Sequence, residues 1–522
     1  MDAAVSMRVM RTVSLMAVLL TGWMTLLVGE AAAAAAAEPF GIRVVDARTG
    51  RGVPMVELTT TSKVTYVTDS AGWVAFDEPG LMDVGEVWLS VKSHGYEMPE
   101  DGFGNRGVRV TPKPGGRTTV KLPRVNLAER LYRVTGQGIY ADSTRLGLKT
   151  PLKQPNLAGQ VTGQDTVQTA LFNGKLYWFW GDTNRPGYPL GQFQTSGATS
   201  ALPGKQNGQG GLHPDVGVDF TYFVGDDGFS RPMAPRPEEG VVWIDSLMVV
   251  PDQGGTNHLL CRYVRLLGLG DPKEEGLMAY NEQKQVFEKL SDYPMSSPAK
   301  PGGHPIHVLD IDDNRWYYFA TPYLTSRVRA DYKSATDLGQ YEVFTPLGRD
   351  GTIERDASGR ARWQWRRGGR PMTAEQMHAR LDSGELKDGD APLVLRDAKT
   401  NQIVRVHASS IAWNHHRKNW VMIAQQLGGD SSYLGELWYA EADALEGPWG
   451  KAVKIVTHDD YTFYNPRHHD MLDQNGGRYI YFEATYTAEF SGTKHPTPRY
   501  DYNQIMYRLD LADPQLRPAY VD

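Results

Sequence analysis

The last two thirds of the chain repeat one pattern of apolar and polar residues. In each repeat, a residue able to donate or accept a proton precedes a short apolar strand, a polar turn and a strand rich in aromatic residues. The pattern occurs at residues 165–183, 245–266, 307–324, 407–427 and 468–487. One hairpin cannot bury both of its faces alone, so such repeats pack around a common axis. The pattern predicts an all-β fold containing a five-bladed β-propeller.

Polar residues stand at the expected starts of the innermost strands. In a propeller these strands begin at the central funnel, so residues far apart in sequence meet in one pocket. The residues at these positions are Asp165, Asp245, His307, His407 and His468. We therefore expect the functional site in the funnel.

The chain before the repeats predicts a second, smaller domain. Residues 38–122 alternate apolar and polar positions over short runs separated by Gly, Pro and Asp, which indicates a small antiparallel β-sandwich. Residues 123–144 form the expected linker, where Leu127, Leu131 and Val134 have near-helical spacing and predict a helix or turn that ends at Gly136. The propeller is expected over residues 145–515.

A polar insertion at about 345–403 separates the third and fourth repeats. Thr373 and Gln376 fit a capping box at the start of a helix. We expect an inserted lobe at the rim of the pocket, with Trp363, Trp365 and Arg366 forming one wall of a substrate cleft.

The N-terminus has the three regions of a secretory signal peptide. Arg8 and Arg11 precede an apolar run over 13–28 and an alanine tract over 31–37. The alternative is a membrane anchor, but the run is shorter than the roughly 20 residues that a spanning helix needs. We expect residues 1–37 to be removed, a secreted or periplasmic protein, and no stable membrane insertion after cleavage.

The composition of the chain limits the classes of binding partner to be expected. The 522 residues carry a formal net charge of -6, and the pI is near 6.1, so there is no basic footprint for nucleic acid. The single cysteine, Cys261, allows no disulfide framework. Neutral or cationic partners are therefore expected rather than polyanions.

Carboxylates are the first candidates for chemistry. Asp165 and Asp182 flank one hairpin, so both can lie at the same end of it, and paired carboxylates are what cleavage of a glycosidic bond requires. The alternative for Asp182 is a turn cap. Asp245 lies between apolar runs and needs partners or a perturbed pKa. Glu483 ends the fifth aromatic strand as Asp182 ends the first, and is a further catalytic candidate.

Histidines are the second candidates. His304, His307, His407 and His468 stand near expected strand starts and are candidate substrate contacts. Three of them, His307, His407 and His468, are also candidate ligands of a divalent ion such as calcium, although a lone histidine is more often a hydrogen-bonded core residue. Further candidate substrate contacts are Trp180, for which packing between blades is the alternative, and Arg185, Tyr464 and Asn465.

These motifs resemble those of the five-bladed propeller glycoside hydrolases. Residues 165–183 are similar to the endo-D-arabinanase type, and residues 435–449 resemble an outer-strand motif of such propellers. The resemblance covers about 145–510 and implies hydrolysis of a polysaccharide or oligosaccharide. One departure matters. Arabinanase-like enzymes often offer a glutamate as general acid in the third blade, whereas residues 302–310 here contain none.

The N-terminal region resembles a carboxypeptidase-regulatory-like, or transthyretin-like, module. The resemblance rests on turn residues of the 46–72 segment, namely Asp46, Gly50, Val53, Pro54, Asp69 and Gly72. It implies an accessory domain.

The function expected from sequence is a secreted glycoside hydrolase with paired carboxylates in the funnel. Two alternatives stay open: a carbohydrate-binding propeller without chemistry, and a polysaccharide lyase in which a histidine or tyrosine takes a proton beside a neutralised uronate.

Overall fold

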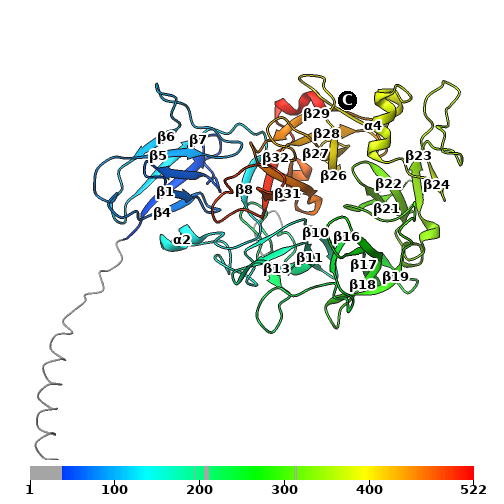
Figure 1. Cartoon of the computed structure of the whole chain (residues 1–522), viewed down its shortest axis with the longest axis horizontal. Coiled ribbons are helices and arrows are strands. Elements are labelled where there is room, and N and C mark those ends of the chain that lie inside the picture. The colour runs from blue at the N-terminus through cyan, green and yellow to red at the C-terminus, as the bar shows by residue number, and fades with distance from the viewer. Residues whose placement is uncertain (1–37, 193, 205–210, 311, 313, 522) are drawn as a thin grey trace, which may run out of the picture.

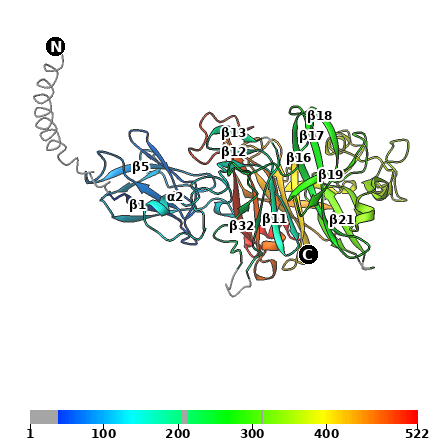
Figure 2. The same cartoon turned by 90° about the horizontal axis from the view of Figure 1, so that it is seen from below.

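The structure is a computed structural model that describes residues 38–192, 194–204, 211–310, 312 and 314–521. The predicted signal peptide, residues 1–37, lies outside the described residues. The fold is all-β, with a sandwich standing at one side of a propeller (Figures 1 and 2). No described helix is long and apolar enough to cross a membrane.

The sandwich consists of two sheets around one apolar core. One sheet has the order β4 (Trp73–Phe76), β1 (Phe40–Asp46) and β7 (Arg117–Leu122). The other has the order β3 (Thr65–Val67), β2 (Glu57–Thr60), β5 (Val87–Lys92) and β6 (Gly107–Val110). The expectation of a purely antiparallel sandwich is wrong in one place, because β1 and β7 pair in parallel. Alternation of side chains shows which face is buried, but it does not show strand direction.

In the described residues the propeller contains five sheets, and apart from β25 and β8 the strands of each sheet follow the order of the chain. The first two are β10 (Gln168–Phe172), β11 (Lys175–Trp180), β14 (Ser196–Ser200) and β15 (Thr221–Tyr222), then β16 (Val241–Pro251), β17 (Asn257–Leu266), β18 (Pro272–Asn281) and β19 (Val286–Asp292). The third is β20 (Ile306–Leu309), β21 (Arg315–Ala320), β22 (Leu324–Arg329), β23 (Glu342–Thr345) and β24 (Gln364–Arg367).

The fourth and fifth sheets complete the set. The fourth is β26 (Val406–Asn414), β27 (Asn419–Gln426), β28 (Leu437–Ala442) and β29 (Trp449–Val456), with β25 (Leu393–Asp397) parallel to β29. The fifth is β30 (Thr462–His468), β31 (Tyr479–Thr487), β32 (Asn503–Asp510) and β8 (Glu129–Arg133). A small separate sheet holds β13 (Tyr188–Gln192), β12 (Thr183–Arg185) and β9 (Gly163–Gln164).

Apolar clusters join neighbouring sheets around the ring. Met278 of the second sheet packs in one cluster with Phe179 of the first, and Val343 of the third packs with Leu277 of the second. The cluster that contains Trp178 of the first sheet also contains Met506 of the last. Side chains of this kind bury the two faces that each sheet presents to its neighbours, which holds the inner strands around a common channel.

Strand β8 closes the ring and corrects the expected helix at 126–136. It pairs antiparallel with β32, placing Tyr132 opposite Met506. All five of its residues are buried. The near-helical spacing was misleading because a strand buried on both faces has no alternation to reveal it. The range expected to be a linker therefore supplies a strand to the propeller, and its one helix is α2 (Ala141–Arg145).

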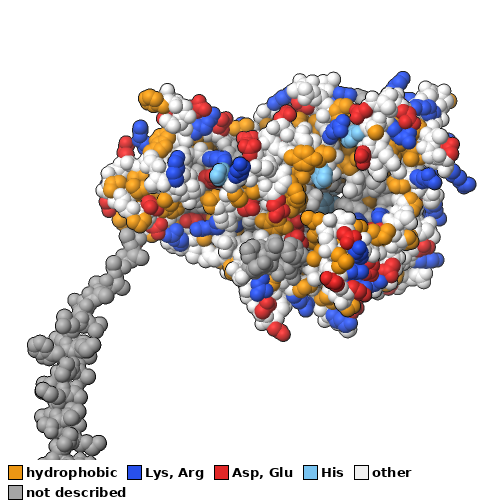
Figure 3. All heavy atoms as spheres, viewed as in Figure 1, with side chains coloured by type: hydrophobic (Ala, Val, Ile, Leu, Met, Phe, Trp, Pro, Cys, Tyr) orange, Lys and Arg blue, Asp and Glu red, His pale blue; other side chains and the backbone are white. Residues whose placement is uncertain are grey.

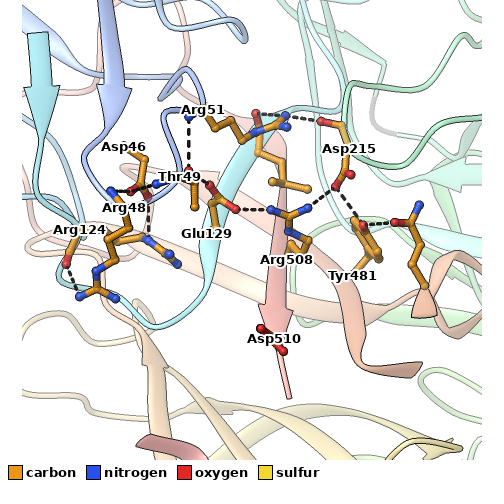
Figure 4. Close-up of polar contacts among 12 residues, drawn as sticks. Asp46, Arg48, Thr49, Arg51, Arg124, Glu129, Asp215, Tyr481, Arg508 and Asp510 are labelled. Carbon is orange, nitrogen blue, oxygen red and sulfur yellow. Dashed lines mark hydrogen bonds and ion pairs between the residues drawn. The ribbon is translucent and has the colours of Figure 1, made fainter. Parts of the chain in front are cut away.

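The sandwich is tied to this closing strand by charged side chains (Figure 4). Thr49 of the sandwich donates a hydrogen bond to Glu129 of β8 at 2.6 Å, and Arg508 of β32 forms an ion pair with the same carboxylate at 2.6 Å. Arg508 also bonds Asp215 at 3.0 Å, and Arg51 donates to the main-chain oxygen of Asp215. Contacts from both domains thus converge where the ring closes.

The insertion at 345–403 packs against the outer strands of the third and fourth sheets. Its helix α4 (Ala374–Asp382) begins with the expected capping box of Thr373 and Gln376. The short helix α3 (Tyr332–Ala335) lies before it in the chain. The expectation of a cleft wall here is wrong, because Trp365 packs on Phe344 with ring centroids 4.9 Å apart and Arg366 is paired with Glu354. None of the insertion residues described lines the funnel cavity.

Candidate active site

A cavity of about 510 Å³ opens where the inner strands begin. Each of the five sheets contributes residues to it from the first part of its inner strand or from the segment just before. The lining includes Asp165, Asp182, Trp243, Asp245, Arg262, His304, Ser409, Tyr464, Asn465, Glu489, Phe490 and Tyr502. A space-filling view shows a hollow within the ring, with histidine side chains beside it (Figure 3). We call this cavity the acidic pocket, because it contains four carboxyl side chains.

Asp165 lies three residues before β10 and is held by its neighbours. The Tyr464 hydroxyl donates to Asp165 Oδ2 at 2.8 Å, whereas Oδ1 is buried and has no hydrogen-bond partner among the described residues. The pKa of Asp165 is raised to about 7, because burial and the nearby charge of Asp182 together outweigh the hydrogen bond from Tyr464, which lowers it. Desolvation and a like charge both disfavour the ionised carboxylate.

Gly181 leaves the space that Asp165 occupies. A Cβ at this position would meet Asp165 Oδ1 at 2.3 Å, which is too close for any side chain. The Gly181 N–H also donates to the Asp165 main-chain oxygen at 2.9 Å. The Gly-Asp sequence after β11 therefore has a steric reason, because it allows the second carboxylate-bearing segment to approach the first.

Asp182 follows β11 and is fixed by an indole. Trp243 Nε1 donates to Asp182 Oδ1 at 2.9 Å. The pKa of Asp182 is raised to about 6, because burial, with a smaller contribution from the charge of Glu489, outweighs the hydrogen bond from Trp243, which lowers it. Asp165 and Asp182 therefore share one pocket with different pKa values, the pattern that separates an acid from a base in enzyme sites.

Asp245 sits at an irregularity in β16. The pairing with β17 shifts register between Asp245 and Met248, and Ser246 has φ of 55°. Such bulges re-aim side chains. Asp245 Oδ2 accepts a hydrogen bond from Arg262 at 2.8 Å, while Oδ1 is buried without a partner among the described residues. Burial raises the pKa of Asp245, and the charge of Arg262 opposes that rise.

Three more of the expected residues line the acidic pocket. His304 is buried, its Nδ1 has no partner among the described residues, and burial together with the charge of Arg467 holds its pKa well below the usual value. Asn465 has φ of 54° and donates to Thr166 Oγ1 at 2.9 Å. With Tyr464, these residues surround the carboxylates with hydrogen-bonding groups.

Other expected site residues lie elsewhere. Glu483 is fully buried in the last sheet, with Oε1 2.8 Å from His469 Nε2. Trp180 is buried and stacks on Trp178. Arg185 lies over the ring of Phe229 and does not line the acidic pocket. Glu483 and Trp180 lie within the aromatic strands β31 and β11, where their side chains are buried, and Arg185 ends the short strand β12.

The histidines do not gather at one point. His407 is exposed and lines neither end of the channel, whereas His307 and His468 line a second cavity at the opposite end. The register expected for His468 is wrong, because this residue ends β30 rather than starting it. Among the described residues, no group of three His, Cys, Asp or Glu side chains is arranged to hold a metal ion.

Sequence reasoning missed several residues of the acidic pocket. Trp243, Arg262 and Glu489 gave no motif of their own. Arg262 stands opposite Asp245 in the β16–β17 pairing and supplies the partner that a buried carboxylate needs, but this pairing is known only from the structure.

Searches among known protein families and among curated proteins found no match to this chain. Solved structures gave distant similarities. An exo-1,5-α-L-arabinanase from a bovine ruminal metagenomic library is 13% identical, with 67% of this chain and 93% of that chain covered and a TM-score of 0.33. The GH43_1 enzyme from Xanthomonas citri complexed with xylotriose is 12% identical, with 68% of this chain and 88% of that chain covered and a TM-score of 0.32.

A third similar structure is the exo-β-1,3-galactanase of Phanerochaete chrysosporium bound to β-1,3-galactotriose. It is 9% identical, covers 73% of this chain and 65% of that chain, and has a TM-score of 0.32. All three are glycoside hydrolases, but similarities this distant carry no argument about what this chain does. The functional argument rests on the side chains of the acidic pocket.

Proposed function

We propose that the protein is a glycoside hydrolase that cleaves a neutral polysaccharide or oligosaccharide in the acidic pocket of a five-bladed propeller. The observation that carries this proposal is the pair Asp165 and Asp182, which share an open cavity with pKa values raised to about 7 and about 6. Two carboxyl groups, one protonated and one ionised, are the equipment of glycosidic cleavage.

The pKa order assigns the roles. Near pH 6.5, between the pKa values of the two groups, Asp165 is mostly protonated and donates its proton to the glycosidic oxygen. Asp182 is then mostly ionised, held in place by Trp243, and either activates water or attacks the anomeric carbon. Asp165 in this role replaces the third-blade glutamate that the sequence lacks.

Asp245 supplies a third negative charge. Arg262 favours its ionised form, and its free Oδ1 is available to a sugar hydroxyl or to the positive charge that develops on the ring. Asp245 therefore acts as a substrate-contacting and electrostatic residue beside the acid and the base.

The surroundings of the carboxylates favour a neutral sugar. Four carboxyl groups face one arginine and one histidine in the lining, so an anionic sugar would be repelled. Phe490, 63% exposed, offers an apolar face at the mouth on which a sugar ring can pack. The N-terminal pattern of residues 1–37 supports secretion or periplasmic export of this enzyme.

The test is incubation of the mature protein with a panel of neutral and uronate-containing polysaccharides. Release of reducing ends without a new double bond in the products supports hydrolysis. We expect this release from the neutral polysaccharides of the panel. Products that absorb in the ultraviolet through a new double bond would establish a lyase. Tight glycan binding without turnover would establish a binding protein.

A further inference from the structure

A second cavity, of about 570 Å³, lies at the opposite end of the channel. It is lined by later residues of the same inner strands that form the acidic pocket: Leu171 of β10, Val249 of β16, His307 of β20, Trp413 of β26 and Arg467 of β30. We call it the basic pocket. The two pockets are therefore separate cavities in series along the inner strands.

The charged and histidine side chains that line the basic pocket are mainly basic, whereas those that line the acidic pocket are mainly carboxyl groups. Its lining contains Arg315, Arg467 and three histidines, His307, His415 and His468, against one carboxylate, Asp470. A cavity with these side chains favours an anion over a neutral or cationic ligand.

Arg467 is the most unusual group in this lining. The residue is 9% exposed, and the described part of the chain gives it neither a hydrogen bond nor an ion pair; its Nε in particular is buried and unpartnered. A buried guanidinium normally has an anionic partner, because removing its charge from water is costly. The charge of Asp470 favours the ionised guanidinium, but no carboxylate of the described residues forms an ion pair with it, and Arg467 lines an open cavity.

Two carboxyl groups act on Arg467, first Asp470, which lines the same pocket, and then Glu483. Neither forms an ion pair with it among the described residues, and Glu483 supplies little charge. Burial raises the pKa of Glu483 to about 8, against the opposing charge of Arg467, so this side chain is mostly protonated at neutral pH. Glu483 is also engaged with His469. His468 adds a second buried atom without a partner, its Nδ1, since only Nε2 is bonded, to Asp473 at 3.0 Å.

An aromatic surface stands at the mouth of the basic pocket. Trp413 is 39% exposed although it is a large apolar side chain, and it meets Trp420 edge to face with ring centroids 5.6 Å apart. An exposed indole fixed in this way offers a flat apolar face to a sugar ring.

We propose that the basic pocket binds an acidic sugar, with the carboxylate of a uronic acid paired to Arg467 and the sugar ring packed on Trp413. Arginine recognises carboxylates with two parallel hydrogen bonds, which a lysine or histidine does not reproduce. The uronic acid is either free or the end of a chain, and both present the same carboxylate. This site binds without cleaving, because its lining holds one carboxylate rather than a pair.

Isothermal titration calorimetry of the mature protein with D-glucuronate tests the proposal. We expect a Kd of about 1 mM, no heat from D-glucose, and binding of acetate weaker than that of glucuronate. Arg467→Gln should weaken glucuronate binding at least about tenfold, and Trp413→Ala should weaken it several-fold. His416→Ala, an exposed neighbour that does not line the pocket, is the matched control.

Unchanged glucuronate affinity in Arg467→Gln, equal binding of glucose, or equal binding of acetate would overturn the proposal. If Arg467→Gln does not fold, the variants Trp413→Ala and His307→Ala, at two exposed residues, test the proposal instead. Loss of glucuronate affinity in both variants supports the proposal, and unchanged affinity in both overturns it. A terminal uronate on a short oligosaccharide, titrated beside the monosaccharide, distinguishes the two sources. Hydrolysis is scored in a separate assay on neutral substrates, so the two proposals fail independently.

Discussion

The two ends of the propeller channel are built from the same five inner strands but carry opposite charge. At the end where the strands begin, Asp165, Asp182 and Asp245 meet one arginine, and burial raises the pKa of each carboxyl. At the other end, Arg467 is buried, and no carboxylate of the described residues forms an ion pair with it. The difference shows that a single strand set can supply two environments, because each strand presents different residues at its start and at its end.

The largest expected effect is at the acidic end. Asp165→Asn removes the proposed proton donor and should lower hydrolysis by about 10²–10⁴-fold, the range for loss of general acid catalysis. Reducing-end release measures this, with circular dichroism to check the fold and glucuronate titration to check the basic end. Asp443→Asn, an exposed carboxylate, is the matched control. Normal activity in Asp165→Asn would end the assignment.

A steric change should have the next effect. Gly181→Ala places a Cβ 2.3 Å from Asp165 Oδ1, so the carboxyl must move, and activity should fall about tenfold to a hundredfold. Gly187→Ala, where the nearest atom is 3.7 Å away, should leave activity unchanged. Equal activity of the two variants would mean that the position of Asp165 does not matter.

A smaller effect is expected from the indole that holds Asp182. Trp243→Phe removes the hydrogen bond that lowers the pKa of Asp182. Because Asp182 must be ionised, the acidic limb of the pH–rate profile should move up by about one pH unit, with only a few-fold loss at the optimum. An unmoved limb would remove Asp182 from the role of base.

The smallest effect on activity is expected from Glu483, which is buried in β31 and lines neither pocket. Its folded pKa is raised from 4.5 to about 8. The stabilisation from the protonated form is therefore complete below about pH 4.5 and is lost as the pH rises through about 8. Glu483→Gln should flatten this dependence, with urea unfolding at several pH values as the measurement. The exposed control Glu375→Gln should keep the wild-type slope.

The part of the acidic pocket that could be predicted from the sequence is the part formed by residues close together in the chain. Asn173 and Gly174 both have positive φ, as a tight hairpin turn requires, so Asp165 and Asp182 return to the same end. The bounds of the last inner strand were not predicted, because β30 begins at Thr462 and His468 is its last residue, at the far end.

Pairing between strands that are far apart in the chain also could not be predicted from local sequence patterns. Residues of β8 form a strand because they pair with the edge of β32, which lies near the other end of the chain. The sequence of residues 126–136 does not indicate this distant partner. The partner of Asp245 was similarly hidden, because Arg262 is identified only once the strand register is known.

The most direct test of the central claim is the pH dependence of reducing-end release from neutral polysaccharides by the wild-type protein and by Asp165→Asn. Hydrolysis requires Asp182 ionised and Asp165 protonated, so the account predicts a bell-shaped profile with its maximum between about pH 6 and about pH 7. The variant should show almost no release at any pH. Wild-type rates in the variant, or a profile without these two limbs, would contradict the account.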